Sequence, residues 1–291
     1  MTAFSNHLFI SNERPVDPLT RQILKVIDGL LRTAGIPYML VGATARDLLL
    51  YHVYGHPITR ATYDLDFAIH LDSWDQFANV KQLLLGVPGF TDKGRIKQRL
   101  YYQPPDVSFE TVIDIIPFGK LEAADRTVAW PPDADVVMNV AAFTDVFTSL
   151  LVVEIEEGLL IPVPSLAGLA VLKLFAWLDR QDGKDVQDIR RLLETYTDAG
   201  NEVRLYEEEA HELELVGFDT VLAGAYLLGK DAHRVTAPNI RSKLSIALSG
   251  RNISALVPQI ARTMSALEDR TELAATLLRQ FFRGFGLNDL L

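Results

Sequence analysis

The stretch TYDLDFAIH, Thr62 to His70, places two aspartates, Asp64 and Asp66, inside an apolar run. Successive side chains of a β-strand point to opposite faces, so the pattern predicts a strand with both carboxylates on one face. Two neighbouring carboxylates repel each other, and their burial is costly unless a positive charge offsets them. Mg²⁺ provides that charge well, because it prefers oxygen ligands. The alternative interpretation is a strand with one solvated face.

The segment upstream, VGATARDLLL from Val41 to Leu50, reads as a strand end, a glycine turn and a helix start. The first turn of a helix presents free N–H groups and a partial positive charge, which suit a phosphate. Gly42 allows close approach of the backbone, Thr44 offers a hydroxyl, and Arg46 follows one turn later. The segment matches neither the dinucleotide fingerprint nor the Walker loop. A plain strand-to-helix connection is the alternative.

The segment downstream, TVIDIIPFG from Thr111 to Gly119, places Asp114 in another apolar strand. A third acid beside Asp64 and Asp66 would complete a carboxylate cluster. Two-metal phosphoryl transfer uses such a cluster to activate the attacking hydroxyl and to stabilise the leaving oxygen. The alternative is a strand-end carboxylate that bonds to the backbone.

Alternating helix and strand patterns extend on both sides of these segments. The periodicities predict helices over 17–36, 44–51 and 72–85, the last capped by Asp72 or Ser73, and strands over 38–41, 62–70, 95–102, 109–119 and 150–164. The last strand region contains a hairpin at Glu157-Gly158. Beyond it the patterns are helical. We therefore expect an α+β fold, with a mixed β-sheet and flanking helices over residues 1–164 and a helical domain over 165–291.

A fourth segment opens the helical domain: LKLFAWLDRQDGKDVQDIRRLL, Leu172 to Leu193. It predicts a helix, a polar break and a second helix. In the simplest interpretation Asp182 caps the second helix, and Lys184 and Asp188 pair across one turn. Lys173 lies between apolar residues of the first helix, so it needs a carboxylate or phosphate partner.

Together, VGATARDLLL, TYDLDFAI and VIDIIPFG resemble the nucleotidyltransferase superfamily of DNA polymerase β. The first of them also looks like the corresponding stretch of CCA-adding tRNA nucleotidyltransferases, although the basic organisation of those enzymes is not evident. The Lys184-Asp185-x-x-Asp188 motif resembles the AbiEii family of nucleotidyltransferase toxins. The resemblance covers about residues 38–193. The chain departs from the family pattern at Ala43, where a second glycine or a serine often stands.

The resemblance implies a nucleotidyltransferase-like fold and a Mg²⁺-dependent nucleotidyltransferase that uses an NTP. It implies that Asp64, Asp66 and Asp114 hold the metal and perform catalysis, Asp114 as the base. It implies a nucleotide site completed by the helical domain and formed by Gly42, Ala43, Thr44, Arg46, Lys173, Lys184, Asp185 and Asp188. It further suggests a type IV toxin with a cognate antitoxin and an RNA or tRNA acceptor. The rival expectations are a small-molecule acceptor, as for antibiotic-modifying members, and an inactive nucleotide-binding module.

Composition adds limits on location and partners. The chain has no cysteine, no long apolar run and no signal-peptide pattern, so we expect a cytoplasmic protein without a membrane span. The net charge is −10, yet residues 230–291 hold nine Lys and Arg against five acids. The basic stretch 230–262 is therefore the expected contact for RNA, if RNA is the acceptor. Arg95, Lys97 and Arg99 would share one strand face, which is either solvated or directed at phosphate.

Overall fold

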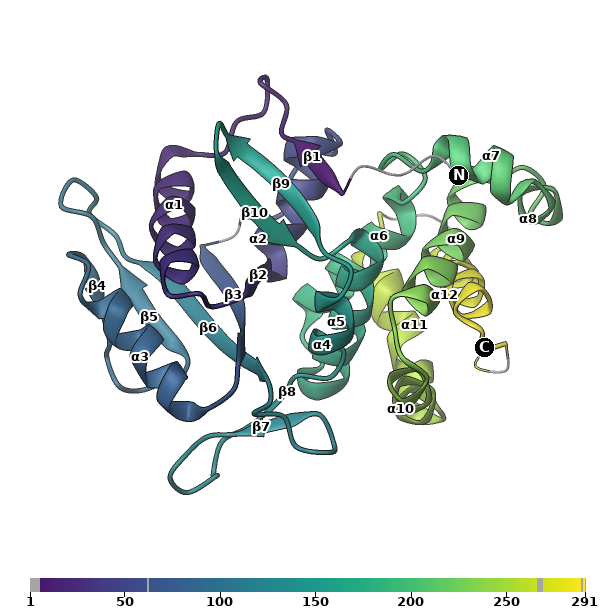
Figure 1. The fold of residues 1–291 in the computed structure, drawn as a ribbon. Coiled ribbons are helices and arrows are strands. Elements are labelled where there is room, and N and C mark those ends of the chain that lie inside the picture. Colours follow the sequence, from purple (N-terminus) through teal and green to yellow (C-terminus); the bar gives the residue numbers. More distant parts are fainter. Residues whose placement is uncertain (1–5, 62, 266–268, 289, 291) are drawn as a thin grey trace. The chain divides into compact units, whose positions relative to one another are not determined.

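The computed structural model describes residues 6–61, 63–265, 269–288 and 290. Thr62, the first residue of the expected aspartate strand, lies outside these ranges. The chain forms two compact units, Met1–Ser165 and Leu166–Leu291. The first combines sheets with helices and the second contains helices, so the α+β expectation is confirmed (Figure 1).

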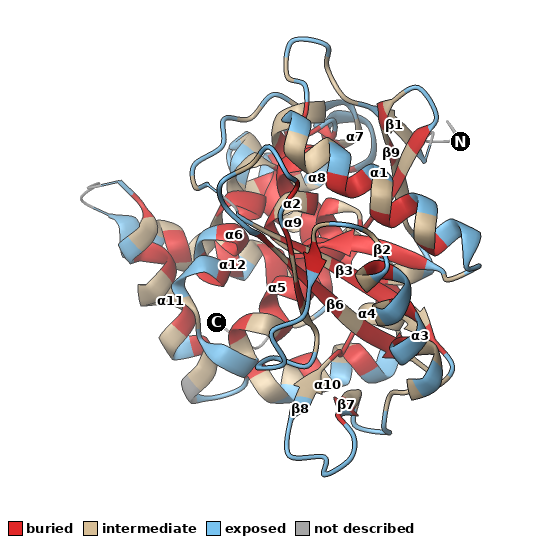
Figure 2. Ribbon diagram, turned by 90° about the vertical axis from the view of Figure 1, so that its left-hand side faces the viewer, coloured by how far each residue is buried: buried red, intermediate tan, exposed pale blue. Residues whose placement is uncertain are grey.

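A five-stranded mixed sheet forms the centre of the first unit. Its strand order is β2-β3-β6-β5-β4, and β3 and β6 pair in parallel while the other neighbours are antiparallel. The strands are β2 (Tyr38–Val41), β3 (Asp64–Leu71), β4 (Phe90–Thr91), β5 (Arg99–Tyr102) and β6 (Thr111–Gly119). Figure 2 shows β2, β3 and β6 as largely buried. The aspartate strand is therefore an inner strand, with a neighbour on each side.

Helices α1 (Pro18–Thr33) and α3 (Trp74–Leu85) cover the apolar face of this sheet (Figure 1). Gln22 of α1 donates a hydrogen bond of 3.1 Å to the hydroxyl of Tyr102 on β5. Leu65 and Phe67 are buried on that face, as the alternation predicts. The opposite face is left to the intervening residues, which include Asp64 and Asp66. Each helix has the cap that its sequence offers, Asp17 for α1 and Ser73 for α3.

Helix α2 (Gly42–Asp47) follows β2 directly and continues into the π-helical turn η1 (Leu48–Val53). Two smaller sheets complete the unit. One has the order β1-β9-β10, formed by β1 (His7–Phe9), β9 (Leu151–Glu156) and β10 (Leu159–Val163), and the other pairs β7 (Thr127–Ala129) with β8 (Val137–Asn139) before the short helix α4 (Phe143–Phe147). The expected hairpin at Glu157-Gly158 is confirmed as the β9–β10 turn.

Two expected elements begin at other residues. The strand expected over 95–102 begins only at Arg99, because Gly94 has a left-handed φ of 67° and residues 96–99 form a turn in which the Arg99 N–H bonds to the Ile96 carbonyl. The expectation that Arg95, Lys97 and Arg99 share a strand face was therefore wrong. The helix expected from Thr44 begins two residues earlier, at Gly42.

The second unit is a bundle of α5 (Leu166–Arg180), α6 (Gly183–Thr195), α7 (Glu202–Glu208), α8 (Ala210–Leu215), α9 (Thr220–Arg234), α10 (Pro238–Leu248), α11 (Arg251–Thr263) and α12 (Arg270–Phe285). Helices α9 and α12 cross in backbone contact. A Cβ on Gly229 of α9 would overlap the Phe281 carbonyl, and a Cβ on Gly284 of α12 would overlap the Tyr226 carbonyl. The two glycines are therefore what allows the close crossing.

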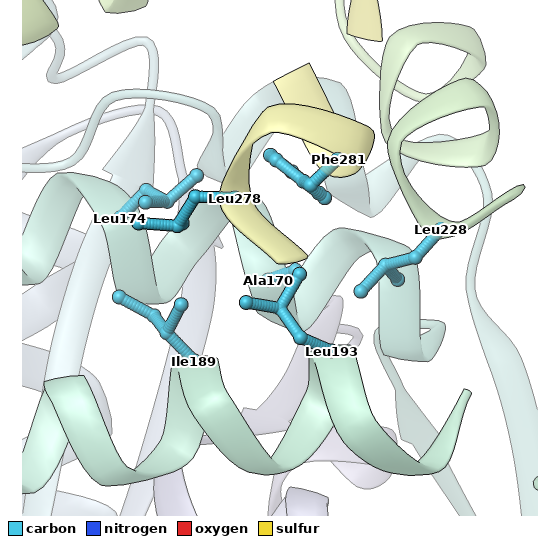
Figure 3. A pocket seen from close by; sticks show the side chains of 7 residues that line it. All are labelled: Ala170, Leu174, Ile189, Leu193, Leu228, Leu278 and Phe281. Carbon is cyan, nitrogen blue, oxygen red and sulfur yellow. The ribbon is translucent and has the colours of Figure 1, made fainter. Parts of the chain in front are cut away.

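A small cavity lies among α5, α6, α9 and α12 of this unit. Figure 3 shows its lining, which is Ala170, Leu174, Ile189, Leu193, Leu228, Leu278 and Phe281. Its volume is about 10 Å³, the space of one water-sized probe. Because the lining is apolar and the volume is small, we assign this cavity to core packing. In the described part of the chain, no helix has the length and apolar composition that a membrane crossing needs.

Candidate active site

The acids predicted on separate strands are brought onto one face of the central sheet. In the parallel pair of β3 and β6, Asp66 is the register partner of Asp114, and Asp64 is the partner of Val112. Register partners point to the same face of a sheet. Asp64, Asp66 and Asp114 therefore lie on the face opposite Leu65 and Phe67. The side chain of Asp114 is mostly buried, whereas Asp64 and Asp66 are half-buried.

The turn at Gly42 lies against one of these carboxylates. Val41 is the register partner of Asp66, and Gly42 follows it with a left-handed φ of 72°. A Cβ at Gly42 would overlap Oδ2 of Asp66. The missing side chain thus makes room for the Asp66 carboxylate at the start of α2. Ala43, next in the turn, is buried.

The neighbouring residues of the turn serve the local fold. The hydroxyl of Thr44 donates to the backbone carbonyl of Asp64 at 3.1 Å, which ties α2 to β3. Arg46 is buried, and its Nε and Nη2 donate to Oδ1 of Asp47 at 2.9 and 2.7 Å. In this arrangement the Arg46 guanidinium faces the protein core.

Asp114 is held by an arginine from the neighbouring strand. Arg99 on β5 is the register partner of Asp114, and its Nε and Nη2 donate to Oδ1 and Oδ2 at 2.8 and 2.7 Å. These hydrogen bonds raise the pKa of the Arg99 guanidinium, and the charges of Asp114 and Asp64 raise it further. The guanidinium is therefore positively charged at any working pH.

The donor set suits Mg²⁺ in its chemistry, because three carboxylates share a face and Gly42 leaves room for one of them. Within residues 6–61, 63–265, 269–288 and 290, however, no three acidic or histidine side chains converge as a ready metal site. Both oxygens of Asp114 accept a hydrogen bond from Arg99 instead.

The second unit gathers the acids of the Lys-Asp-x-x-Asp motif around a buried lysine. Nζ of Lys173 on α5 lies 3.2 Å from Oδ1 of Asp185 and 2.6 Å from Oδ2 of Asp188, both on α6. Arg180 adds two bonds of 2.7 Å to Asp185. Asp185 is 0% exposed and Asp188 is 1% exposed. The prediction that Lys173 needs a carboxylate partner is confirmed.

Lys184 differs from the other members of the motif, because it is exposed. Its side chain makes no ion pair among the residues that the structure describes. Its backbone N–H donates to Oδ1 of Asp182 at 2.9 Å, so the predicted cap of α6 is confirmed. The pair that the sequence suggested between Lys184 and Asp188 is not formed, since Asp188 bonds to Lys173 instead.

Much of the basic stretch 230–262 is used internally. Lys230 pairs with Glu209, Arg234 pairs with Asp231 at 2.9 Å, and Arg241 donates to the carbonyls of His233 and Thr236. Arg262 is exposed, and the side chain of Arg251 lies outside what the structure describes. Fewer cations are thus available to RNA here than the sequence suggested.

Sequence reasoning missed two arginines. Arg99 was considered only as part of a basic strand face, and its pairing with Asp114 depends on the antiparallel register of β5 and β6. Arg180 was not considered, although it lies at the end of α5, directly before the polar break that precedes α6. Its spacing from Asp185 was the available signal, because a short interhelical turn brings the two ends together.

Comparison with known proteins gives one family and several solved structures. The model of the family described as nucleotidyl transferase AbiEii toxin, type IV TA system, matches residues 30–277. A search of curated proteins found no match.

Solved structures with similarity to the chain have low identity. An antigenic nucleotidyltransferase-like protein from Paracoccidioides brasiliensis is 17% identical, with 74% of this chain and 94% of that chain covered and a TM-score of 0.42. The antibiotic-resistance factor ANT(2'')-Ia is 13% identical, with 69% and 98% covered and a TM-score of 0.38. The Thermotoga maritima CCA-adding enzyme, solved with tRNA, is 14% identical, with 90% and 70% covered and a TM-score of 0.25.

Proposed function

The chain belongs to the family of AbiEii nucleotidyltransferase toxins of type IV toxin–antitoxin systems, and from this premise we propose a Mg²⁺-dependent transfer of NMP from NTP to an acceptor hydroxyl. Family membership makes the protein a nucleotidyltransferase. The metal, the acceptor and the site residues belong to the proposal.

The observation that supports the proposal most directly is the parallel register of β3 and β6. It sets Asp66 beside Asp114, with Asp64 two residues away on the same face. Two strands that are far apart in sequence thus supply acids to one surface, and helices cover the other surface. Three carboxylates on one face repel one another, so their shared face favours a role in binding a cation.

In the proposed reaction the acceptor oxygen attacks the α-phosphorus of the NTP in line with the leaving group. The new bond joins that oxygen to the α-phosphorus, the bond from the α-phosphorus to the bridging oxygen breaks, and pyrophosphate leaves. Asp114 takes the proton of the acceptor hydroxyl. Mg²⁺, held by Asp64, Asp66 and Asp114, would neutralise the phosphates and the carboxylates during this step.

We propose the turn Gly42-Ala43-Thr44 as a contact of the triphosphate, and we propose Lys184 of the second unit as a residue that binds nucleotide. Lys184 is exposed and has no ion pair in the described residues, which supports this role. Lys173 and Arg180 pair with Asp185 and Asp188 inside the second unit. We propose that they set the geometry of the turn that presents Lys184. The burial of Arg46 favours an internal role for that residue.

We propose RNA or tRNA as the acceptor by analogy with nucleotidyltransferase toxins. The rival acceptor is a small molecule, and the internal use of Lys230, Arg234 and Arg241 favours it. We also propose that a cognate antitoxin controls the protein and that the protein acts in the cytoplasm. An inactive nucleotide-binding module is the remaining alternative.

The test is incubation of the purified protein with each α-labelled NTP, Mg²⁺ and total cellular RNA, with a parallel reaction on small hydroxyl-bearing molecules. Transfer of label to RNA supports the RNA acceptor, and transfer to a small molecule supports its rival. Asp64→Asn should abolish transfer without loss of fold, while Asp72→Asn, an exposed acid that pairs with Lys120 at 3.1 Å, should not change it. Absence of transfer with every NTP and acceptor would contradict the proposal.

A further inference from the structure

The guanidinium of Arg99 places a positive charge on the acid face of the central sheet. The register aligns Asp66 on β3, Asp114 on β6 and Arg99 on β5 in one row across three strands. Arg99 bonds to both oxygens of Asp114, and the charge of Asp64 acts on it as well. The cation thus interacts with two of the three acids assigned to the metal.

An arginine that bonds to both oxygens of a carboxylate competes with a metal ion for that carboxylate. Each oxygen of Asp114 accepts a hydrogen bond from Arg99, of 2.8 Å at Oδ1 and 2.7 Å at Oδ2. Each oxygen keeps a second lone pair that a metal could use, so the competition between Arg99 and a metal is one of charge. A guanidinium at that distance also repels a divalent cation. Arg99 therefore opposes metal binding at Asp114, because it stabilises the carboxylate without metal and repels the incoming cation.

We propose that Arg99 is an internal counter-cation of Asp114, which pairs with this carboxylate in the metal-free protein and competes with a metal ion for it. This inference rests on the proposed function, because it requires Asp114 to be a metal ligand. It makes Arg99 a positioning residue, which keeps the cluster stable without metal and lowers its metal affinity.

Two consequences separate this role from a purely structural one. Removal of the guanidinium should leave Asp114 without this counter-charge, so the metal-free protein becomes less stable. The same removal should strengthen metal binding, because the competitor is gone. A purely structural role predicts the loss of stability and a metal affinity that is equal or weaker.

The experiment measures Mn²⁺ binding to the full chain by electron paramagnetic resonance, without nucleotide. Arg99→Gln should bind Mn²⁺ about 10-fold more tightly than the parent, within the range by which neighbours of metal ligands alter affinity. Arg99→Lys keeps the positive charge but lacks the planar guanidinium with its two parallel donors. Its Mn²⁺ affinity should therefore lie between those of the parent and of Arg99→Gln. Arg95→Gln removes an exposed arginine a few residues away and should match the parent.

Melting curves with and without Mn²⁺ give a second readout. The metal should raise the melting temperature of Arg99→Gln by more than it raises that of the parent. If Arg99→Gln does not fold, the Mn²⁺ affinity of Arg99→Lys is the test. We expect Arg99→Lys to bind Mn²⁺ more tightly than the parent. Equal or weaker affinity in the variants overturns the inference and leaves the proposed function standing. Failure of Mn²⁺ to bind the parent and the variants alike overturns both.

Discussion

Gly42 links the fold to the acid face at the scale of a single residue. Its φ of 72° lies in the left-handed region, and its missing side chain leaves space that Oδ2 of Asp66 would otherwise share with a Cβ. Two separate requirements, one of conformation and one of space, therefore meet at this position. The sequence predicts close approach of the Gly42 backbone to a phosphate, and it does not identify the carboxylate of Asp66 as a neighbour.

We predict that Gly42→Ala destabilises the protein by more than the cost of the left-handed conformation, which is about 1–2 kcal/mol. The added cost comes from the displacement of Asp66. Gly35→Ala is the matched control, because Gly35 has a φ of 65° and a methyl group added there would meet no other atom within 4 Å. Urea unfolding of both variants measures the difference. Equal losses of stability in the two variants would contradict the close contact between Gly42 and Asp66.

The acids and Arg99 show how far single residues can be predicted. Period-two alternation between buried and half-buried positions indicates that Asp64 and Asp66 share a face, because alternation is a local property of strands. The pairing of Asp114 with Arg99 depends on which strands become neighbours. Which strands become neighbours depends on the packing of the whole sheet. The sequence around Asp114 or Arg99 therefore does not predict their pairing.

At the scale of elements, the start of α6 separates a capping residue from an exposed lysine. Asp182 accepts a hydrogen bond from the backbone of Lys184, while the side chain of Lys184 is exposed. We predict that Asp182→Ala lowers stability by about 1 kcal/mol, the usual value of an N-cap, with little change in NTP affinity. Lys184→Ala should weaken NTP binding and leave stability nearly unchanged. Calorimetric titration with NTP and melting curves on both variants check this, and unchanged affinity in Lys184→Ala would remove the lysine from the nucleotide site.

The crossing of α9 and α12 gives a second prediction about elements. Gly229→Ala should destabilise the second unit strongly, because the new methyl group meets the Phe281 carbonyl and neither backbone can yield without moving a helix. Gly29→Ala in α1 is the control, since nothing lies within 4 Å of its added methyl group. It should stabilise the protein by roughly 0.5–1 kcal/mol, as alanine does in place of glycine inside a helix. Thermal unfolding followed by circular dichroism measures both changes.

Elements with strong local signals were predicted best. The helices that became α1, α3 and α6 have N-caps of a recognisable residue type, and α1 also follows an apolar periodicity. Strand β5 was predicted too long, because alternating charges imitate a strand where Gly94 and a turn interrupt the backbone. Strands β1, β4, β7 and β8 were missed. Each has two or three residues, and such short strands form only because a partner strand is present.

At the scale of the whole molecule, stability in acid depends on a buried network in the second unit. Burial alone would raise the pKa of Asp231, but hydrogen bonds from Arg204 and Tyr196 outweigh it and lower the pKa. The folded state then binds this proton less readily than the unfolded state. Asp231 therefore contributes to stability at pH values above its ordinary pKa of about 4. This contribution is lost as the pH falls through the lowered pKa of the folded state.

We therefore predict that Asp231→Asn costs roughly 1.5–3 kcal/mol near pH 7, as expected for lost hydrogen bonds to a charged group. The difference from the parent should shrink as the pH falls below about 4. Asp198→Asn changes an exposed acid in the same unit and should cost little at either pH. Urea unfolding at several pH values tests this. A difference between Asp231→Asn and the parent that stays constant with pH would show that Asp231 acts through packing.

The small sheet of the first unit has a consequence for how the chain is made. Strand β1 pairs in parallel with β9, with His7 opposite Val152, and the Ile10 N–H extends the pairing to Glu154. During translation β1 leaves the ribosome early and has no partner until Leu151 and its neighbours have emerged. A variant that lacks residues 7–10 would leave one edge of β9 unpaired. An unpaired strand edge can pair with strands of other chains. These residues are distant in sequence from Asp64, Asp66 and Asp114. We expect aggregation in the cell to be the first effect of their loss.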